Sequence, residues 1–303
     1  MVKEGKLNVL VTGGTGFVGK ALQKQNPNWC YLSSRDCDLR NASECFAVFD
    51  LLKPDAIIHL AGRVGGIKEN SENQASFFHD NVLINTNVLH QAFLCGIKRV
   101  LSSLSTCAFP DVVKEYPFTE EQIFDGTPAK TNFSYGFTKR MLHVQSMAYR
   151  KQYGLDYSTF CPTNVYGPGD DFDSDKSHFV AALVSKLHRA KTGETVEFWG
   201  TGNPLRQQLY IEDLAQIIPI LLEKHHSETP LIVSPPENLS ISEMVKILSS
   251  KVQKEIKVSY NKQLDGQFRK DGSNKQLLEL IGNYNFTKFE DGILKTYEWY
   301  SKK

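Results

Sequence analysis

A tyrosine and a lysine at helical spacing carry the clearest chemistry in this chain of 303 residues. Tyr135 and Lys139 are four positions apart, so their side chains would lie on one face of a helix. The ammonium would lower the pKa of the phenol and make proton transfer to a carbonyl oxygen practical near neutral pH. Upstream, hydroxyl groups including that of Ser105 end a predicted strand. Together these residue types predict oxidation or reduction of a carbonyl carbon. A solvent-facing Tyr–Lys pair is the plainer alternative.

A glycine-rich turn near the N-terminus predicts a dinucleotide site. It follows an apolar run ending at Thr12, and glycines recur there at every third position. Glycine permits a tight turn and lets the backbone approach a pyrophosphate, while the helix beginning near Gly16 would present free N–H groups. A surface turn is the alternative, but the strand–turn–helix context favours the cofactor. The expected cofactor residues here are Gly13, Gly14, Thr15, Gly16, Phe17, Val18 and Gly19.

An arginine at the end of the second predicted strand favours NADP over NAD. Arg35 could pair with the 2′-phosphate that distinguishes NADP, whereas the adjacent Asp36 favours NAD, whose ribose hydroxyls a carboxylate accepts. An ordinary surface arginine is the alternative. Asp38 and Leu39 are placed to approach the adenine. We therefore predict NADP, with NADPH as the hydride donor.

The composition excludes several other classes of protein. There are 35 basic and 34 acidic side chains, a balance that argues against nucleic acid or an anionic membrane as partner. No apolar run approaches the roughly 20 residues of a membrane span, and the first residues are charged, so we expect a cytoplasmic protein. The six cysteines show neither a C-x-x-C pair nor metal-ligand spacing, so no metal site is expected.

Predicted strands and helices alternate along the first half of the chain, and they must position these residues. This alternation predicts an α/β fold with a doubly wound, Rossmann-type parallel sheet and ligands at the carboxyl ends of its strands. The expected strands are Leu7–Thr12, Trp29–Leu32, Ala56–Leu60, Val100–Leu104 and Tyr157–Cys161. The expected helices are one from near Gly16, then Ser43–Leu52, Ser76–Cys95 and Ser134–Tyr153.

The pattern changes after Cys161, where prolines, glycines and an acidic loop predict a second, smaller α/β lobe. Gln208–Ile211, Glu212–Lys224 and Leu231–Val233 follow the order strand, helix, strand and are expected to return to the sheet. Ser242–Val252, Ile256–Tyr260 and a last helix near Phe289–Ser301 come after them. We expect residues 1–165 with 208–233 to form the NADP-binding domain, and 166–207 with 234–303 to form the substrate-binding domain.

Further motifs give the sequence a resemblance to a known family. They are Ala61–Ile67, Leu104–Pro110, Pro162–Pro168, the pair Ser177 and His178, and Trp199–Arg206. With the glycine turn and the Tyr–Lys pair, they resemble the extended short-chain dehydrogenase/reductase family and, within it, the GDP-L-fucose synthase family, from about residue 8 to the last helix. The resemblance implies conversion of GDP-4-keto-6-deoxy-D-mannose to GDP-L-fucose: epimerisation at C3 and C5 through enolates, then reduction of the C4 ketone by NADPH.

The resemblance also implies roles for single residues. Tyr135 would protonate the C4 oxygen, Lys139 would bind the nicotinamide ribose, and Ser105 would hydrogen-bond the C4 carbonyl. Epimerisation needs a base and an acid beside the ketone, and Cys107 and His178 fit that need. A buried structural cysteine and a capping or surface histidine are the alternatives. Further expected cofactor residues are Ala61, Gly62, Pro162, Thr163, Asn164, Val165 and His178.

The same resemblance implies that the substrate is bound by Lys186, Trp199, Arg206 and Asp265. Arg206 suits bidentate contact with phosphate, and Trp199 offers a flat aromatic face. A solvated helix lysine, a core tryptophan and a D-G turn are the plainer alternatives for Lys186, Trp199 and Asp265. Thr15 stands where some relatives carry an arginine, which would leave Arg35 alone to select NADP.

Other functions and the assembly remain open at this point. On the same fold, a nucleotide-sugar 4-epimerase, a reductase or a 4,6-dehydratase is the nearest rival. A dehydratase usually has an Asp-Glu pair where this chain has Cys107 and Ala108. A non-catalytic NADP-sensing module would lack the Tyr–Lys pair, which is intact. A homodimer formed by Ser76–Cys95 and Ser134–Tyr153 is expected by analogy.

Overall fold

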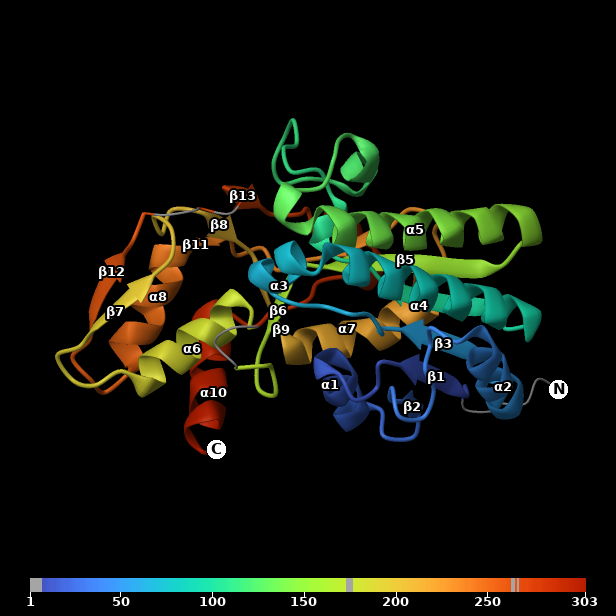
Figure 1. The fold of residues 1–303 in the computed structure, drawn as a ribbon, viewed down its shortest axis with the longest axis horizontal. Coiled ribbons are helices and arrows are strands. Elements are labelled where there is room, and N and C mark those ends of the chain that lie inside the picture. Colours follow the sequence, from blue (N-terminus) through green and yellow to red (C-terminus); the bar gives the residue numbers. More distant parts are fainter. Residues whose placement is uncertain (1–6, 173–176, 263–264, 266) are drawn as a thin grey trace.

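The chain is built around a six-stranded parallel sheet (Figure 1). The computed structural model describes residues 7–172, 177–262, 265 and 267–303. The sheet has the order β10-β5-β4-β3-β1-β2. Its strands are β1 (Val9–Thr12), β2 (Cys30–Leu32), β3 (Ala56–His59), β4 (Arg99–Ser103), β5 (Asp156–Pro162) and β10 (Leu231–Val233). Chain order reverses between β1 and β3, which is where a doubly wound sheet binds its ligand. The predicted fold class is confirmed.

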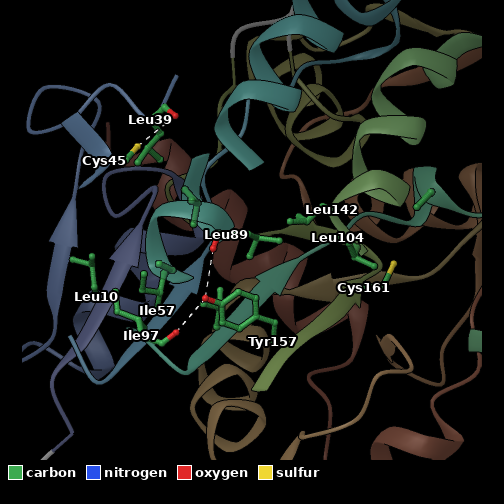
Figure 2. Packing of buried hydrophobic residues seen from close by; sticks show 14 of the residues in the cluster. Leu10, Leu39, Cys45, Ile57, Leu89, Ile97, Leu104, Leu142, Tyr157 and Cys161 are labelled. Atoms are coloured by element: carbon green, nitrogen blue, oxygen red, sulfur yellow. Dashed lines mark hydrogen bonds between the residues drawn. The ribbon is translucent and has the colours of Figure 1, made fainter. Parts of the chain in front are cut away.

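Successive side chains of each strand point to opposite faces of the sheet. Because apolar side chains stand on both faces, helices cover both. The helices are α1 (Phe17–Gln25), α2 (Ala42–Leu52), α4 (Gln74–Leu94), α5 (Phe133–Tyr153), α7 (Ile211–Lys224) and α9 (Lys275–Ile281). Leu10 and Ile57 pack with residues of α2, α4 and α5, whereas their neighbours Val11 and Ile58 pack with residues of α1, α7 and α9. Figure 2 shows the first cluster, in which the Tyr157 hydroxyl donates to the carbonyl oxygen of Ile97 at 3.1 Å. Among the described residues no helix is both long and apolar enough to cross a bilayer.

A separate apolar cluster lies beyond the carboxyl ends of the strands. It is formed around α6 (Phe179–Arg189), α8 (Ile241–Lys251) and α10 (Phe289–Ser301). Two strands, β7 (Thr195–Phe198) and β12 (Lys257–Tyr260), pair in parallel at its outer side. These elements occupy the left of Figure 1, away from the sheet. Two lobes with the boundaries given above stay a prediction.

Two small sheets connect the large one to this cluster. β6 (Asn164–Tyr166) pairs with β9 (Gln208–Tyr210), while β8 (Leu205–Arg206) pairs with β11 (Leu239–Ser240) and β13 (Arg269–Lys270). The expectation that 208–211 returns to the main sheet is therefore wrong. That segment is a strand, but β6 follows β5 directly and offers its own edge to β9, so only β10 joins the sheet.

Short elements around the site complete the fold. They are α3 (Ile67–Glu72) and three 3₁₀ helices, η1 (Thr106–Ala108), η2 (Glu120–Phe124) and η3 (Lys130–Asn132). Like α9, they span too few residues for a hydrophobic period to reveal them. The element that matters most for function is η1, because it follows β4 and carries Cys107.

Candidate active site

The glycine turn between β1 and α1 forms a cradle that side chains would fill. Gly13 has φ +73°, and a Cβ there would lie 2.8 Å from the backbone nitrogen of Ala61. A Cβ on Gly19 would overlap the carbonyl oxygens of Gly13 and Gly14. Gly16 precedes α1, whose first turn has no side-chain cap, so its N–H groups stay free to bind an anion. The residues present thus fit a dinucleotide.

Arg35 lies in an exposed turn directly after β2. The carboxylate of Asp36 accepts from the backbone nitrogen and the hydroxyl of Ser33, at 2.7 and 2.6 Å, and these hydrogen bonds lower its pKa. Asp36 is thereby held within the turn, which removes the main objection to NADP. The carboxylate of Asp38 pairs with Arg40 at 2.8 Å, and Leu39 is buried. Among the described residues, the Arg35 side chain has no ion-pair partner, so its charge is available to a phosphate.

A buried polar network joins the end of β3 to helix α5. The Thr12 hydroxyl lies 2.8 Å from Nδ1 of His59, and Nε2 of His59 lies 3.1 Å from Oδ1 of Asn85. The Asn85 amide nitrogen donates to the carbonyl oxygen of Thr138, one residue before Lys139. Burial, aided by the charge of Lys139, lowers the pKa of His59 to about 3. This chain of residues, called the His59 network below, was not found from the sequence.

The remaining predicted cofactor residues line the ends of β3 and β5. The Ala61 nitrogen donates to the Thr12 hydroxyl at 3.4 Å, and a Cβ on Gly62 would lie 3.7 Å from Nζ of Lys139. Pro162 ends β5, and Thr163, Asn164 and Val165 follow it. The Thr163 nitrogen donates to the carbonyl oxygen of Val233 at 3.0 Å, which fixes this segment beside β10. Both segments lie at the carboxyl edge of the sheet. Ala61 and Gly62 lie next to Lys139, and residues 162–165 lie at the end of β5 and just beyond it.

Tyr135 and Lys139 are both buried on α5, as their helical spacing predicted. Lys139 donates to the carbonyl oxygen of Ser103 at 2.9 Å, and burial lowers the pKa of Lys139 to about 8. Burial raises the pKa of Tyr135, and a hydrogen bond with Ser105 lowers it in part. The expectation that Lys139 lowers the pKa of Tyr135 is therefore wrong. Removal of the phenol from water dominates, and Nζ of Lys139 lies 5.9 Å from its ring centroid.

Cys107 meets Tyr135 where η1 packs against α5. Gly136 makes the close approach possible, because a Cβ there would overlap the carbonyl oxygen of Cys107. Ser105 caps η1, and its hydroxyl accepts from the Cys107 backbone nitrogen at 3.2 Å. Ser105, Cys107 and Tyr135 are thus brought together at the end of β4. The hydroxyls of Ser105 and Tyr135 can serve one oxyanion, with the thiol beside them.

A lysine that the sequence did not single out contacts Cys107, and its charge also acts on His178. Nζ of Lys270, on β13, donates to Sγ of Cys107 at 3.4 Å. His178 is the N-cap residue of α6; desolvation and then the charge of Lys270 lower its pKa, which Asp171 raises. No local spacing could reveal Lys270, since it is 163 positions from Cys107. The site therefore holds a thiol and an imidazole that share one ammonium.

The four predicted substrate residues divide into two pairs. Burial lowers the pKa of Arg206, while Asp265 and Cys107 raise it, and in the β8–β13 pairing Arg206 lies opposite Lys270. Both carboxylate oxygens of Asp265 accept from Thr201, at 2.7 and 2.6 Å. Lys186 instead donates to the carbonyl oxygen of Glu197 at 2.9 Å, and Trp199 is 72% exposed. Within the described ranges, neither Lys186 nor Trp199 contacts a catalytic residue.

Known proteins share this sequence and fold. Residues 9–234 match the model of the NAD dependent epimerase/dehydratase family. The GDP-L-fucose synthase of Dictyostelium discoideum is 35% identical, with 97% of this chain and 95% of that protein covered. A probable GDP-L-fucose synthase of Drosophila melanogaster is 36% identical, with 96% of each covered.

A solved structure gives the same result. The GDP-L-fucose synthetase of Naegleria fowleri bound to NADP superposes with a TM-score of 0.89, at 34% identity, covering 98% of this chain and 93% of the other. Similarity of this extent covers both the sheet and the cluster beyond it. The chain therefore belongs to the NAD dependent epimerase/dehydratase family and, within it, to the GDP-L-fucose synthases.

Proposed function

We propose that the chain converts GDP-4-keto-6-deoxy-D-mannose to GDP-L-fucose with NADPH, by epimerisation at C3 and C5 and reduction at C4. One observation carries this proposal: a thiol, Cys107, lies beside the phenol of Tyr135 and the hydroxyl of Ser105. A simple ketone reductase needs the two hydroxyls but has no use for a thiol next to them. The family membership supports the same function.

The epimerisation uses Cys107 and His178 as base and acid. The base removes the proton at C3 or C5, and the electron pair of that C–H bond moves onto the C4 oxygen. Ser105 and Tyr135 donate hydrogen bonds to the enolate oxygen so formed. The acid then delivers a proton to the opposite face of the same carbon, and the electron pair returns from oxygen to carbon. Before the next inversion, the base releases its proton to solvent and the acid takes one up, so both return to their starting forms.

The reduction uses Tyr135 and Lys139. The glycine turn and Arg35 would hold NADPH, which would supply a hydride for C4. Burial keeps Tyr135 protonated at neutral pH, so its proton is available to the oxygen that becomes a hydroxyl. One N–H of the Lys139 ammonium donates to the carbonyl oxygen of Ser103, and the other two can donate to ribose hydroxyls.

Arg206 is the proposed contact to the substrate diphosphate, because it lies opposite Lys270, which contacts Cys107, and its guanidinium can bind phosphate oxygens bidentately. Trp199 and Lys186 are proposed to contact the nucleotide farther out. Asp265 is proposed to act through the 199–202 turn, whose Thr201 it holds by two hydrogen bonds.

The experiment that tests this function is incubation with GDP-4-keto-6-deoxymannose and NADPH in deuterated water. Deuterium at C3 and C5 of the GDP-L-fucose product, read by mass spectrometry and NMR, is expected. NADPH oxidation without label would leave only a ketone reductase. Inversion at C4 alone, with no net NADPH consumption, would indicate a 4-epimerase. Heat-inactivated protein controls for exchange of the ketone with solvent.

The assembly proposed is a homodimer that pairs α4 and α5 of two copies. Both helices lie side by side at the surface (Figure 1). Each of them carries large apolar side chains that are exposed. These are Phe78, Leu94, Phe133, Met141, Val144 and Tyr153. Light scattering should give twice the mass of the 34.2 kDa chain for the native protein, one chain for Val144→Glu, and a dimer for Lys246→Glu on the distant helix α8. A native monomer would contradict the proposal.

A further inference from the structure

Lys270 is the cation that directly contacts the thiol of the site. Its Nζ lies 3.4 Å from Sγ of Cys107, and both side chains are partly buried. An ammonium at hydrogen-bond distance stabilises a thiolate over a thiol, through charge and through the N–H donor. The charge of Lys270 also acts on His178, where it disfavours the imidazolium. One residue is thus placed to influence both proposed proton-transfer groups.

The fold holds Lys270 in place through backbone pairing. β13 runs parallel to β8, with Lys270 opposite Arg206. Arg269 and Asp271 form an ion pair at 2.6 Å, so residues on both sides of Lys270 are bound to each other, and successive strand residues point to opposite faces. The side chain of Gln207 and the backbone of Gly272 fix the end of the segment. A freely moving surface lysine would show none of this.

We propose that Lys270 is a positioning residue for the epimerisation: its ammonium, in contact with the sulfur, holds Cys107 in its thiolate form. The proposal rests on the proposed function only for its effect on turnover. Other groups that act on the thiol are the cations Lys139 and Arg206 and the neutral Tyr135 and Cys161. Among these, Lys270 is the one with a hydrogen bond to Cys107.

The first test follows alkylation of Cys107 by iodoacetamide as a function of pH, without substrate, using peptide mass spectrometry. In Lys270→Met, alkylation at pH 7 should become about tenfold slower and its pH midpoint should rise by about one unit, the effect of losing a contacting positive charge. Lys270→Arg should recover most of the native profile. Lys275→Met, an exposed lysine at the start of α9, is the control, and the partly buried Cys30 and Cys95 are internal references.

The second test measures uptake of deuterium at C3 and C5 in the same variants. Lys270→Met should lose about tenfold or more, while the affinity for NADPH, measured by fluorescence titration, stays within about twofold. A native alkylation profile in folded, NADPH-binding Lys270→Met would overturn the proposal. Lost deuterium uptake with a native profile would also overturn it, because Lys270 would then act on the substrate directly. If the native protein takes up no deuterium, the proposed function fails, yet the alkylation result still decides whether Lys270 controls Cys107.

Discussion

Tyr135 and Lys139 reach the site from a helix of 21 residues, whereas Arg206 and Lys270 reach it from strands of two residues each. The first pair is buried among elements of the main sheet. The second belongs to the small sheet β11-β8-β13, between the main sheet and the cluster around α6 and α8. The proposed reduction thus depends on residues of one long helix, α5. The proposed epimerisation also depends on contacts between the main sheet and the small sheet β11-β8-β13. Substitutions made in each of these two regions should show whether reduction and epimerisation can be lost independently.

Tyr135→Phe should have the largest effect. Reduction of an epimerised 4-keto intermediate should slow by about 10³-fold, because a general acid contributes on the order of 10²–10⁴. Deuterium uptake should fall by only about tenfold, since Ser105 can still donate to the enolate oxygen. NADPH absorbance and mass spectrometry measure the two rates. Equal losses would mean that the sheet side serves both reactions equally.

Cys107→Ser should give the reverse pattern. Deuterium uptake should drop by about 10²-fold, because a serine hydroxyl is a far weaker base than a thiolate. Reduction of the epimerised intermediate should stay within about threefold of native, since Tyr135 and Lys139 are untouched. Parallel loss of both activities would remove Cys107 from epimerisation and make its role structural.

Lys139→Met should slow reduction yet stabilise the fold at neutral pH. Lowering the pKa from 10.5 to about 8 corresponds to roughly 3 kcal/mol against the charged form, offset in the variant by the lost bond to Ser103. Between pH 8 and 10.5 the unfolded native chain keeps a proton that the folded chain has released, so native stability rises with pH. Urea unfolding should show the variant more stable at pH 7, with the difference shrinking as pH rises to 10.5. An advantage independent of pH would mean that another cause is at work.

Arg35→Ala should have the smallest effect, because Arg35 is remote from both reactions. The ratio of kcat/KM for NADPH to that for NADH should fall by about tenfold, the size of one charge-assisted contact. Arg189→Ala, an exposed arginine at the end of α6, should leave the ratio unchanged. If Arg35→Ala also leaves it unchanged, selection of NADP lies elsewhere.

Features encoded by short-range spacing were predictable from the sequence. The glycine turn, the Tyr135–Lys139 pair and the strands of the main sheet depend on residues within one or two turns of each other, and the structure has them as expected. The role of Gly136 was not predictable, because it depends on the packing of α5 against η1. Lys270 escaped notice for a similar reason: backbone pairing of β13 with β8 brings it to Cys107.

The pKa values of the site residues were harder to predict from the sequence than their positions. The i to i+4 spacing correctly placed Tyr135 and Lys139 on one helix, but it carried no information on how much water reaches them. Desolvation raises the pKa of Tyr135 and lowers that of Lys139, and for both groups it is the largest cause of the shift. The partners of Asp36 and Asp38 were likewise hidden, since turn geometry decides them.

The His59 network has a consequence for how the enzyme responds to acid. Asn85 gives its amide nitrogen to Thr138 and so turns its oxygen to His59, which fixes the imidazole proton on Nε2 and leaves Nδ1 to accept from Thr12. With a pKa of about 3, this imidazole takes up no proton over the range in which cells live. The wall behind the catalytic lysine is therefore electrically constant. Between pH 5 and 9, the His59 imidazole therefore contributes no change of charge to the rate.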